Sequence, residues 1–91
     1  MSTIARRVVV HGVVQGVFFR DTCRRQARTA GVSGWVRNRA DGSVEALFEG
    51  TPGAVQSMVD WAHSGPTYAV VERVEVSAAE PGHGPGFEVR D

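Results

Sequence analysis

The sequence predicts an α+β sandwich in which two helices cover one face of an antiparallel sheet. Three observations predict this fold: segments with the period of strands, two segments with the period of helices, and their order along the chain. A chain of 91 residues buries enough surface for only one hydrophobic core. We therefore expect residues 1–91 to form a single domain.

The charge and composition of the chain narrow its possible functions. Ten basic residues, all arginine, balance ten acidic residues, which argues against nucleic acid or a membrane as partner. No apolar run approaches the ~18 residues of a membrane span. The lone cysteine cannot form an internal disulfide, and residues 1–7 lack the apolar core of a signal peptide. We expect a cytoplasmic protein and, from its small size, a monomer.

The first predicted strand is followed by the first predicted helix. Arg6–Val13 is rich in valine, which favours a strand. Beyond it, apolar residues recur at helical spacing until Gly31, a residue suited to end a helix. The apolar series is Phe19, Cys23, Ala27 and Ala30. The opposite side carries Arg24, Arg25 and Arg28, which we interpret as a solvated face that also raises the local potential for an anion.

A hairpin is predicted next. Ser33–Arg39 and Ser43–Gly50 flank a short turn that contains Asp41 and Gly42. In the second of these strands, apolar residues alternate with glutamates, which predicts one buried face and one solvent-exposed face. The alternating residues are Val44, Ala46 and Phe48 against Glu45 and Glu49.

The rest of the chain supplies the second helix and the last strands. Thr51-Pro52 is a typical helix start, and Gly65-Pro66 a typical end. Between them lies an apolar stripe made of Val55, Met58, Val59 and Ala62. Val70–Ala78 is predicted to be a strand, and Phe87–Arg90 a possible short fifth strand. The order βαββαβ indicates the ferredoxin-like, split βαβ arrangement.

The turn before the first helix is the most informative segment. Val14-Gln15-Gly16-Val17-Phe18 contains no Ser, Thr, Asn or Asp that could cap the helix. The first amides of a helix lack partners, and together with the helix dipole they attract an anion. Gly16 can turn successive amides inward, and Arg20 offers a planar fork of donors. These features predict a phosphate-binding site.

Several blocks of the sequence resemble the acylphosphatase family, whose members hydrolyse the carboxyl–phosphate mixed anhydride. The blocks stand in the family's order and span nearly the whole chain. They are Gly12–Arg20, Gly34–Asn38, Asp41–Glu45, Gly65-Pro66 and Val74–Val76. The resemblance also implies the ferredoxin-like fold.

The resemblance implies a function for named residues. The amides of Gln15, Gly16, Val17, Phe18, Phe19 and Arg20 would hold the phosphate. Arg20 would also bind it through the guanidinium, and Asn38 would orient the attacking water. The enzyme would be an acylphosphate phosphohydrolase that acts on a small acyl phosphate, needs no cofactor and no metal, and is inhibited by its product, inorganic phosphate.

The remaining residues include few candidates for a catalytic role. The sequence contains no nucleophile with an evident base partner, no metal-ligand cluster and no Gly-x-x-x-x-Gly-Lys phosphate loop. We interpret Cys23 as a small buried hydrophobic residue rather than a nucleophile. His11, His63 and His83 do not have the spacing of metal ligands.

Two other functions are compatible with the predicted fold. The chain could be an acylphosphatase-like module that handles carbamoyl phosphate in a maturation pathway, which substrate profiling would distinguish. It could also be an RNA-binding domain, because a ferredoxin-like sheet can stack bases on aromatic residues. Arg6–Val13 has no aromatic residue, which argues against RNA binding.

Overall fold

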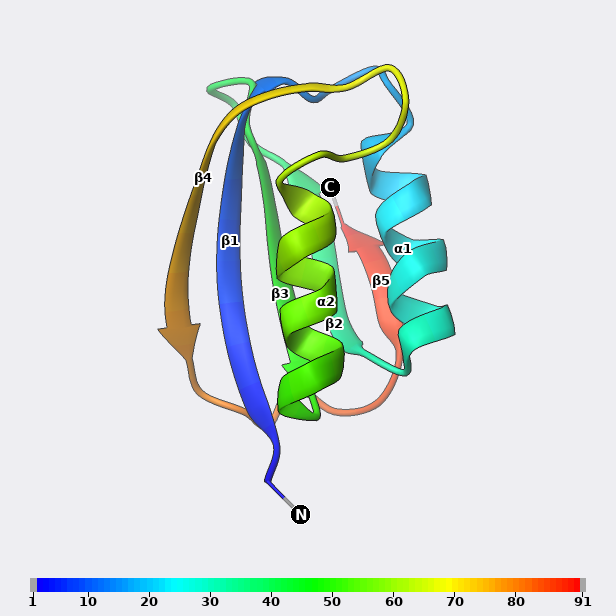
Figure 1. Ribbon diagram of the computed structural model, residues 1–91, viewed down its shortest axis with the longest axis vertical. Helices are drawn as coiled ribbons and strands as arrows, with labels where there is room; N and C mark the ends of the chain where they lie inside the picture. The colour runs from blue at the N-terminus through cyan, green and yellow to red at the C-terminus, as the bar shows by residue number, and fades with distance from the viewer. Residues whose placement is uncertain (1, 91) are drawn as a thin grey trace.

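The computed structural model describes residues 2–90, and its elements follow the predicted order (Figure 1). The fifth strand is present, so this part of the prediction is confirmed. The elements are β1 (Ile4–Val13), α1 (Phe19–Ala30), β2 (Ser33–Asn38), β3 (Val44–Gly50), α2 (Pro52–Ala62), β4 (Val70–Ala79) and β5 (Phe87–Arg90).

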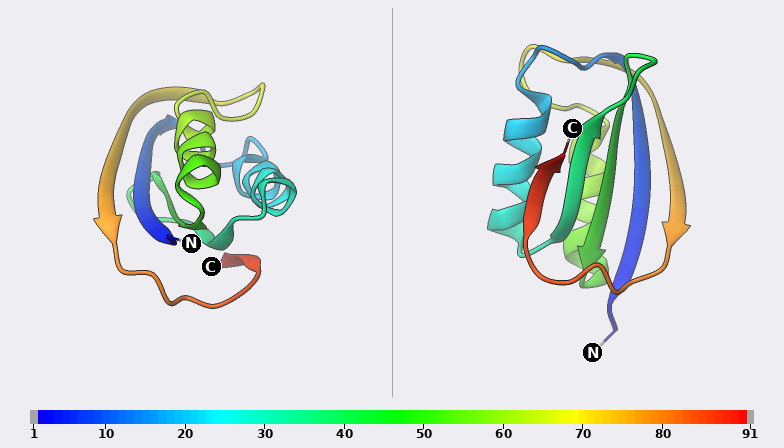
Figure 2. Two further views of the ribbon diagram at one scale, coloured as in Figure 1. Left: turned by 60° about the horizontal axis from the view of Figure 1, so that its bottom comes forward. Right: turned by 180° about the vertical axis from the view of Figure 1, so that it is seen from behind.

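The sheet has the strand order β4-β1-β3-β2-β5. Every pair is antiparallel except β2 and β5, which are parallel, so the sheet is mixed and not wholly antiparallel as we expected. The reason is the connection after β4, which passes from one edge of the sheet to the other (Figure 2). The Glu49 carboxylate accepts hydrogen bonds from the amides of Gly82 and His83, each at 3.0 Å, and so ties this connection to β3.

Both helices pack on the concave face of the sheet, and the core lies between the two layers (Figure 2). The predicted stripe of α2 is buried throughout. In α1, Phe19, Cys23 and Ala27 are buried, but Ala30 in the last turn is exposed. Within residues 2–90, no helix has the length and apolar character needed to cross a membrane.

The outer face of the sheet differs from the prediction at Glu45. We expected this residue on the solvent-exposed face, but it is only 3% exposed. Arg7 donates to one carboxylate oxygen and Arg37 to the other, the latter at 2.6 Å. Burial alone would raise the pKa of Glu45, but the hydrogen bonds from Arg37 and Arg7 outweigh burial and hold the pKa below its usual value. The two arginine side chains therefore shield the carboxylate from water.

Candidate active site

The loop between β1 and α1 has an unusual backbone. Gly16 has a φ of 74° and Phe18 a φ of 64°, both in the left-handed region. Glycine enters this region at little cost, whereas a residue with a Cβ pays roughly 1–2 kcal/mol. Phe18 is the N-cap of α1, and no side chain caps this end of the helix. Strain of this kind persists only where the surrounding structure enforces it, and it clusters at functional sites.

The amides of this loop and of the first helical turn are unpartnered. Within residues 2–90, no amide from Gln15 to Arg20 donates a hydrogen bond to a protein acceptor. The hydrogen bonds of α1 begin at Thr22, whose amide donates to the carbonyl of Phe18 at 3.1 Å. Successive free amides at the positive end of a helix dipole are suited to an anion. The predicted uncapped terminus is therefore present.

The Gln15 side chain fixes the loop in place. Its Nε2 donates to the carbonyl oxygens of Arg39, at 2.8 Å, and Ser43, at 3.0 Å, both in the β2–β3 turn. That turn is itself held by Asp41, which accepts from the Ser43 hydroxyl and amide. These two hydrogen bonds lower the pKa of the Asp41 carboxyl. The Gln15 side chain is thus an anchor of the loop.

A pocket of about 430 Å³ opens beside the start of α1. It lies between the first turns of α1 and the ends of β2 and β5. Its lining residues are Val14, Gly16, Phe18, Phe19, Arg20, Asp21, Arg24, Asn38 and Val89. Of the residues that the sequence singled out, Gln15 and Val17 do not line it. The structure thus brings Arg20 and Asn38, from different elements, to one pocket.

Asn38 reaches the pocket because of strand alternation. It lies two residues after the buried Val36, so both side chains point to the helix-covered face of the sheet. Asn38 is half-buried at the end of β2, and its Oδ1 atom is fully buried without a hydrogen-bond partner. A buried amide oxygen without a donor is uncommon in proteins and calls for a specific explanation.

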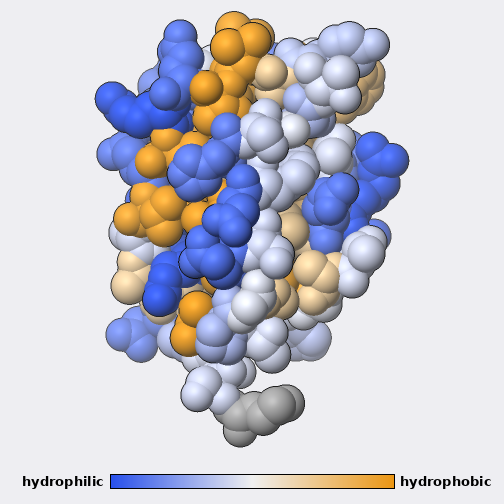
Figure 3. All heavy atoms as spheres, in the orientation of Figure 1, coloured by the Kyte–Doolittle hydropathy of each residue, from blue (hydrophilic) through white to orange (hydrophobic). Residues whose placement is uncertain are grey.

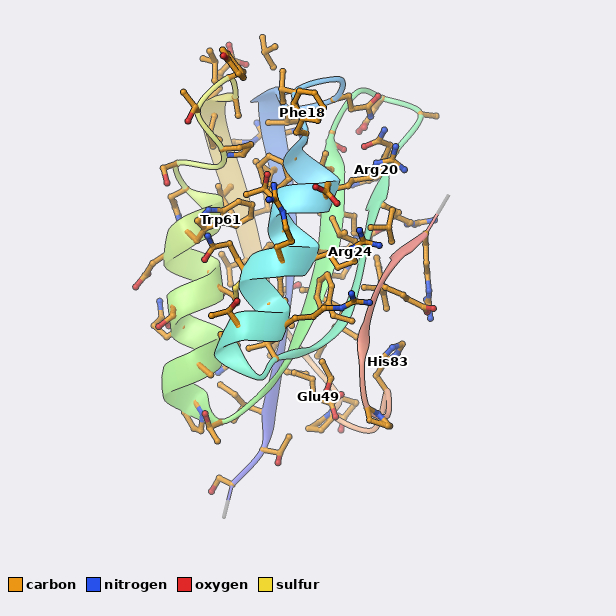
Figure 4. All side chains as sticks on the ribbon, turned by 90° about the vertical axis from the view of Figure 1, so that its right-hand side faces the viewer. Phe18, Arg20, Arg24, Glu49, Trp61 and His83 are labelled. Carbon is orange, nitrogen blue, oxygen red and sulfur yellow. The ribbon has the colours of Figure 1, made fainter. Side chains whose placement is uncertain are left out.

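The charges at the pocket are arranged around Asp21. Its carboxylate accepts from Nη2 of Arg24 at 2.9 Å and lies 3.4 Å from Nε of Arg25. Within residues 2–90, no carboxylate lies within 4.0 Å of the Arg20 guanidinium. Phe18 precedes α1, and Arg20 and Arg24 follow along the helix (Figure 4). Among the described residues, Arg20 therefore has its positive charge available to an anion in the pocket.

The cysteine and two of the histidines are buried or contact other groups of the protein. Cys23 is fully buried, and burial raises the pKa of its thiol far above the usual value. His11 contacts Glu75 at 2.5 Å, and His63 contacts the carbonyl of Val59 at 2.9 Å. Within residues 2–90, no group of three or more His, Cys, Asp and Glu residues is arranged to hold a metal ion. The interpretation of Cys23 as a buried hydrophobic residue is confirmed.

One side of the pocket mouth is apolar. The Phe18 ring, at its edge, is 71% exposed. Val13 and Val70, paired across β1 and β4, are also exposed, but they do not line the pocket. Apolar residues gather at the upper end and on the β4 side of the molecule (Figure 3). The pocket thus combines the side chains of Arg20, Arg24 and Asp21 with an apolar margin formed by Phe18.

Four residues that line the pocket were not predicted as site residues, namely Val14, Asp21, Arg24 and Val89. Val89 lines it because β5 pairs with β2, and nothing in the sequence indicated that edge. Arg24 lines it because it lies four residues after Arg20, one helical turn along the same face. This spacing was visible in the sequence, but we assigned Arg24 to a solvated face that raises the local potential for an anion, and not to the pocket itself.

Comparisons with known proteins agree with this geometry. A family model described as acylphosphatase matches residues 6–89. A protein of Acidovorax sp. (strain JS42) named acylphosphatase is 52% identical over 90 residues, which cover 99% of this chain and 93% of the relative.

Solved structures of other proteins share the fold of this chain. The structure of an acylphosphatase from Coxiella burnetii has a TM-score of 0.92 and 33% identity, over 97% of this chain and 93% of that chain. The structure of T. kodakarensis HypF has a TM-score of 0.84 and 27% identity, over 97% of this chain but only 12% of that chain. The fold therefore occurs both in proteins of similar length and as a small part of a larger one.

Proposed function

This chain belongs to the acylphosphatase family, and on this premise we propose that its β1–α1 pocket hydrolyses the carboxyl–phosphate bond of acyl phosphates. The protein is an enzyme of this family. The observation that carries the assignment of the site is the meeting of three features at one pocket. They are the unpartnered amides of the loop, the Arg20 guanidinium and the Asn38 amide.

The phosphate group binds at the start of α1. The amides from Gln15 to Arg20 donate to its oxygens, and the helix dipole favours its charge. Arg20 adds a planar fork of donors that matches two phosphate oxygens. Because Gln15 anchors the loop to the β2–β3 turn, these donors are held in place before the substrate arrives.

The reaction needs few catalytic groups. The water oxygen attacks phosphorus while the bond from phosphorus to the acyl oxygen breaks, and the carboxylate leaves with the electron pair. Its conjugate acid has a pKa of roughly 4, so no general acid is required. The transition state of phosphoryl transfer is loose, and positioning with charge stabilisation carries most of the catalysis.

Asn38 orients the attacking water, and a phosphate oxygen of the substrate accepts the water proton. The products are a carboxylate and inorganic phosphate, and atoms and charges balance without another reactant. Support for the role of Asn38 comes from its place at the pocket with Arg20.

The second candidate substrate is carbamoyl phosphate, which offers the same phosphate group. This alternative came with the family resemblance, and the fold does occur as a small part of one larger protein. The apolar margin at Phe18 favours a larger acyl group instead, because an exposed aromatic ring gains from covering apolar surface. Comparing kcat/KM for benzoyl phosphate and carbamoyl phosphate decides between them, and we expect benzoyl phosphate to be the better substrate.

The test of the proposed function is hydrolysis of benzoyl phosphate by the purified protein in the presence of a metal chelator. We expect turnover that the chelator leaves unchanged and that inorganic phosphate inhibits competitively. A folded protein without turnover on any acyl phosphate would overturn the proposal.

We also propose that residues 1–91 act as one unit, as a monomer, in the cytoplasm. One fully buried cysteine, with no second cysteine for an internal disulfide, suits a reducing compartment. Light scattering coupled to size-exclusion chromatography should give a mass close to 9.8 kDa. A dimer mass would contradict the monomer.

A further inference from the structure

Two buried polar side-chain atoms within residues 2–90 have no hydrogen-bond partner. They are Nε of Arg24 and Oδ1 of Asn38. One is a donor and the other an acceptor, and both residues line the same pocket of about 430 Å³. Buried polar groups in folded proteins are nearly always hydrogen-bonded, so two complementary unpaired atoms at one site need an explanation.

Asp21 already holds part of the Arg24 side chain. Its carboxylate accepts from Nη2 of Arg24 at 2.9 Å. This contact orients the guanidinium, and Nε is the buried nitrogen of Arg24 that has no partner. Arg24 extends from α1 beside Arg20, on the side of the helix that faces β2 and β5 (Figure 4). It is therefore presented toward the strand that ends at Asn38.

The orientation of the Asn38 amide matters for its role. The two ends of an amide have nearly the same shape, so the hydrogen-bond network decides which end faces which way. A donor on Oδ1 keeps the oxygen inside and directs the Nδ2 donors into the pocket. There they can hold the oxygen of the attacking water with a lone pair of that oxygen toward phosphorus.

We propose that Nε of Arg24 donates to Oδ1 of Asn38 when substrate fills the pocket, and that Arg24 thereby positions the Asn38 amide for water activation. This inference rests on the proposed function. The negative charge of the bound phosphate attracts the Arg24 guanidinium inward, which brings the donor to the acceptor. Arg24 is a positioning residue, because it acts on the water through Asn38.

A direct contact between Arg24 and the substrate is the main alternative. In that case the Arg24 charge would bind an oxygen of the phosphate or a second anionic group on the acyl part. Removing it would weaken binding, so KM and the inhibition constant of phosphate would rise. A lysine at this position would keep the charge and restore much of the affinity. A positioning role instead lowers kcat and is not restored by lysine.

The experiment is a double-mutant cycle on benzoyl phosphate hydrolysis. It compares the wild type with Arg24→Ala, Asn38→Ala and the double variant, and adds Arg24→Lys. Arg25→Ala is the matched control, because Arg25 also contacts Asp21 but its side chain is 68% exposed. Thermal unfolding of every variant checks that the fold is intact.

We expect Arg24→Ala to lower kcat about 10- to 100-fold, as outer-shell partners of metal ligands do. The inhibition constant of phosphate should stay near the wild-type value, and Arg24→Lys should show the same loss. In the Asn38→Ala background, removing Arg24 should have no further effect on kcat.

Three results would overturn the inference while leaving the proposed function intact. They are wild-type kcat in Arg24→Ala, recovery in Arg24→Lys, and losses that multiply fully in the double variant. Absence of turnover in the wild type would instead remove the proposed function, so the two failures are distinct.

Discussion

The N-termini of the two helices differ in what surrounds them. Neither is capped by a side-chain hydrogen bond. At α2, Thr51 has ordinary extended angles, Pro52 supplies no amide, and Thr51, Pro52 and Gly53 are all exposed. At α1, the preceding loop contains two left-handed residues, and side chains from β2 and β5 face the same pocket.

This comparison shows that a missing cap does not by itself mark a binding site. Both helices have free first-turn amides, and water satisfies such groups at an exposed helix end. What distinguishes α1 is a preceding loop with two left-handed residues and further unpartnered amides, together with Arg20 and Asn38 at one pocket. The first turn of α2 has no charged residue and nothing equivalent. Variants at both ends test whether this difference determines activity.

Arg20→Ala should give the largest effect. We expect kcat to fall by about 10³ to 10⁵, by analogy with arginine residues that stabilise phosphoryl transfer. The unfolding free energy of the variant should stay close to that of the wild type, because Arg20 makes no ion pair with a described residue. Steady-state kinetics and denaturant unfolding check both. Near wild-type turnover would contradict the assignment, and Arg25→Ala on the same helix serves as the control.

Asn38→Ala should be the next most severe change. We expect a loss of about 10² to 10³ in kcat, the usual effect of removing one polar group from a transition-state site. Inhibition by phosphate should persist, because Arg20 and the loop amides remain. The measurement compares the loss in kcat of this variant with the change in its inhibition constant for phosphate, both relative to the wild type. Equal losses in both would show that Asn38 binds phosphate instead of orienting water.

Gln15→Ala should weaken the loop itself. Removing two hydrogen bonds to the β2–β3 turn should cost about 1–3 kcal/mol of unfolding free energy. Phosphate should also bind less tightly, since the donors are no longer fixed. Gln56→Ala on α2 is the matched control, because its single exposed contact with Asp60 contributes only about 0.2–0.5 kcal/mol. Equal losses of unfolding free energy in Gln15→Ala and Gln56→Ala would contradict the anchoring role.

Thr51→Ala should have the smallest effect. A working Ser or Thr cap contributes about 0.5–2 kcal/mol, but Thr51 makes no capping hydrogen bond. We expect a change within about 0.5 kcal/mol in the unfolding free energy and no change in turnover. A larger loss, measured by denaturant unfolding, would mean that Thr51 caps α2 in solution.

The sequence predicted the order of elements because local periodicity determines it. It did not predict the parallel pairing of β5, because a strand of four residues after a long connection carries no signal for the edge it joins. The burial of Glu45 was also missed, since it depends on Arg7 and Arg37 from two neighbouring strands. Only tertiary structure brings these residues together.

The candidate site was partly predictable because some of its residues lie within one short segment of the chain. Gly16 and Arg20 belong to one short segment, so the anion site followed from local sequence and helix chemistry. Strand alternation places Asn38 on the helix-covered face, but its role came from the family resemblance. The left-handed angle of Phe18 could not be predicted, because phenylalanine rarely adopts it.

The most direct test of the central claim is a titration of the ¹⁵N-labelled protein with inorganic phosphate, followed by amide chemical shifts. We predict that the amides of Gln15–Arg20 shift together along one saturating curve, while the amides of Gly53 and Ala54 at the start of α2 do not move. Equal shifts at both helix starts, or unmoved amides in Gln15–Arg20, would contradict the account.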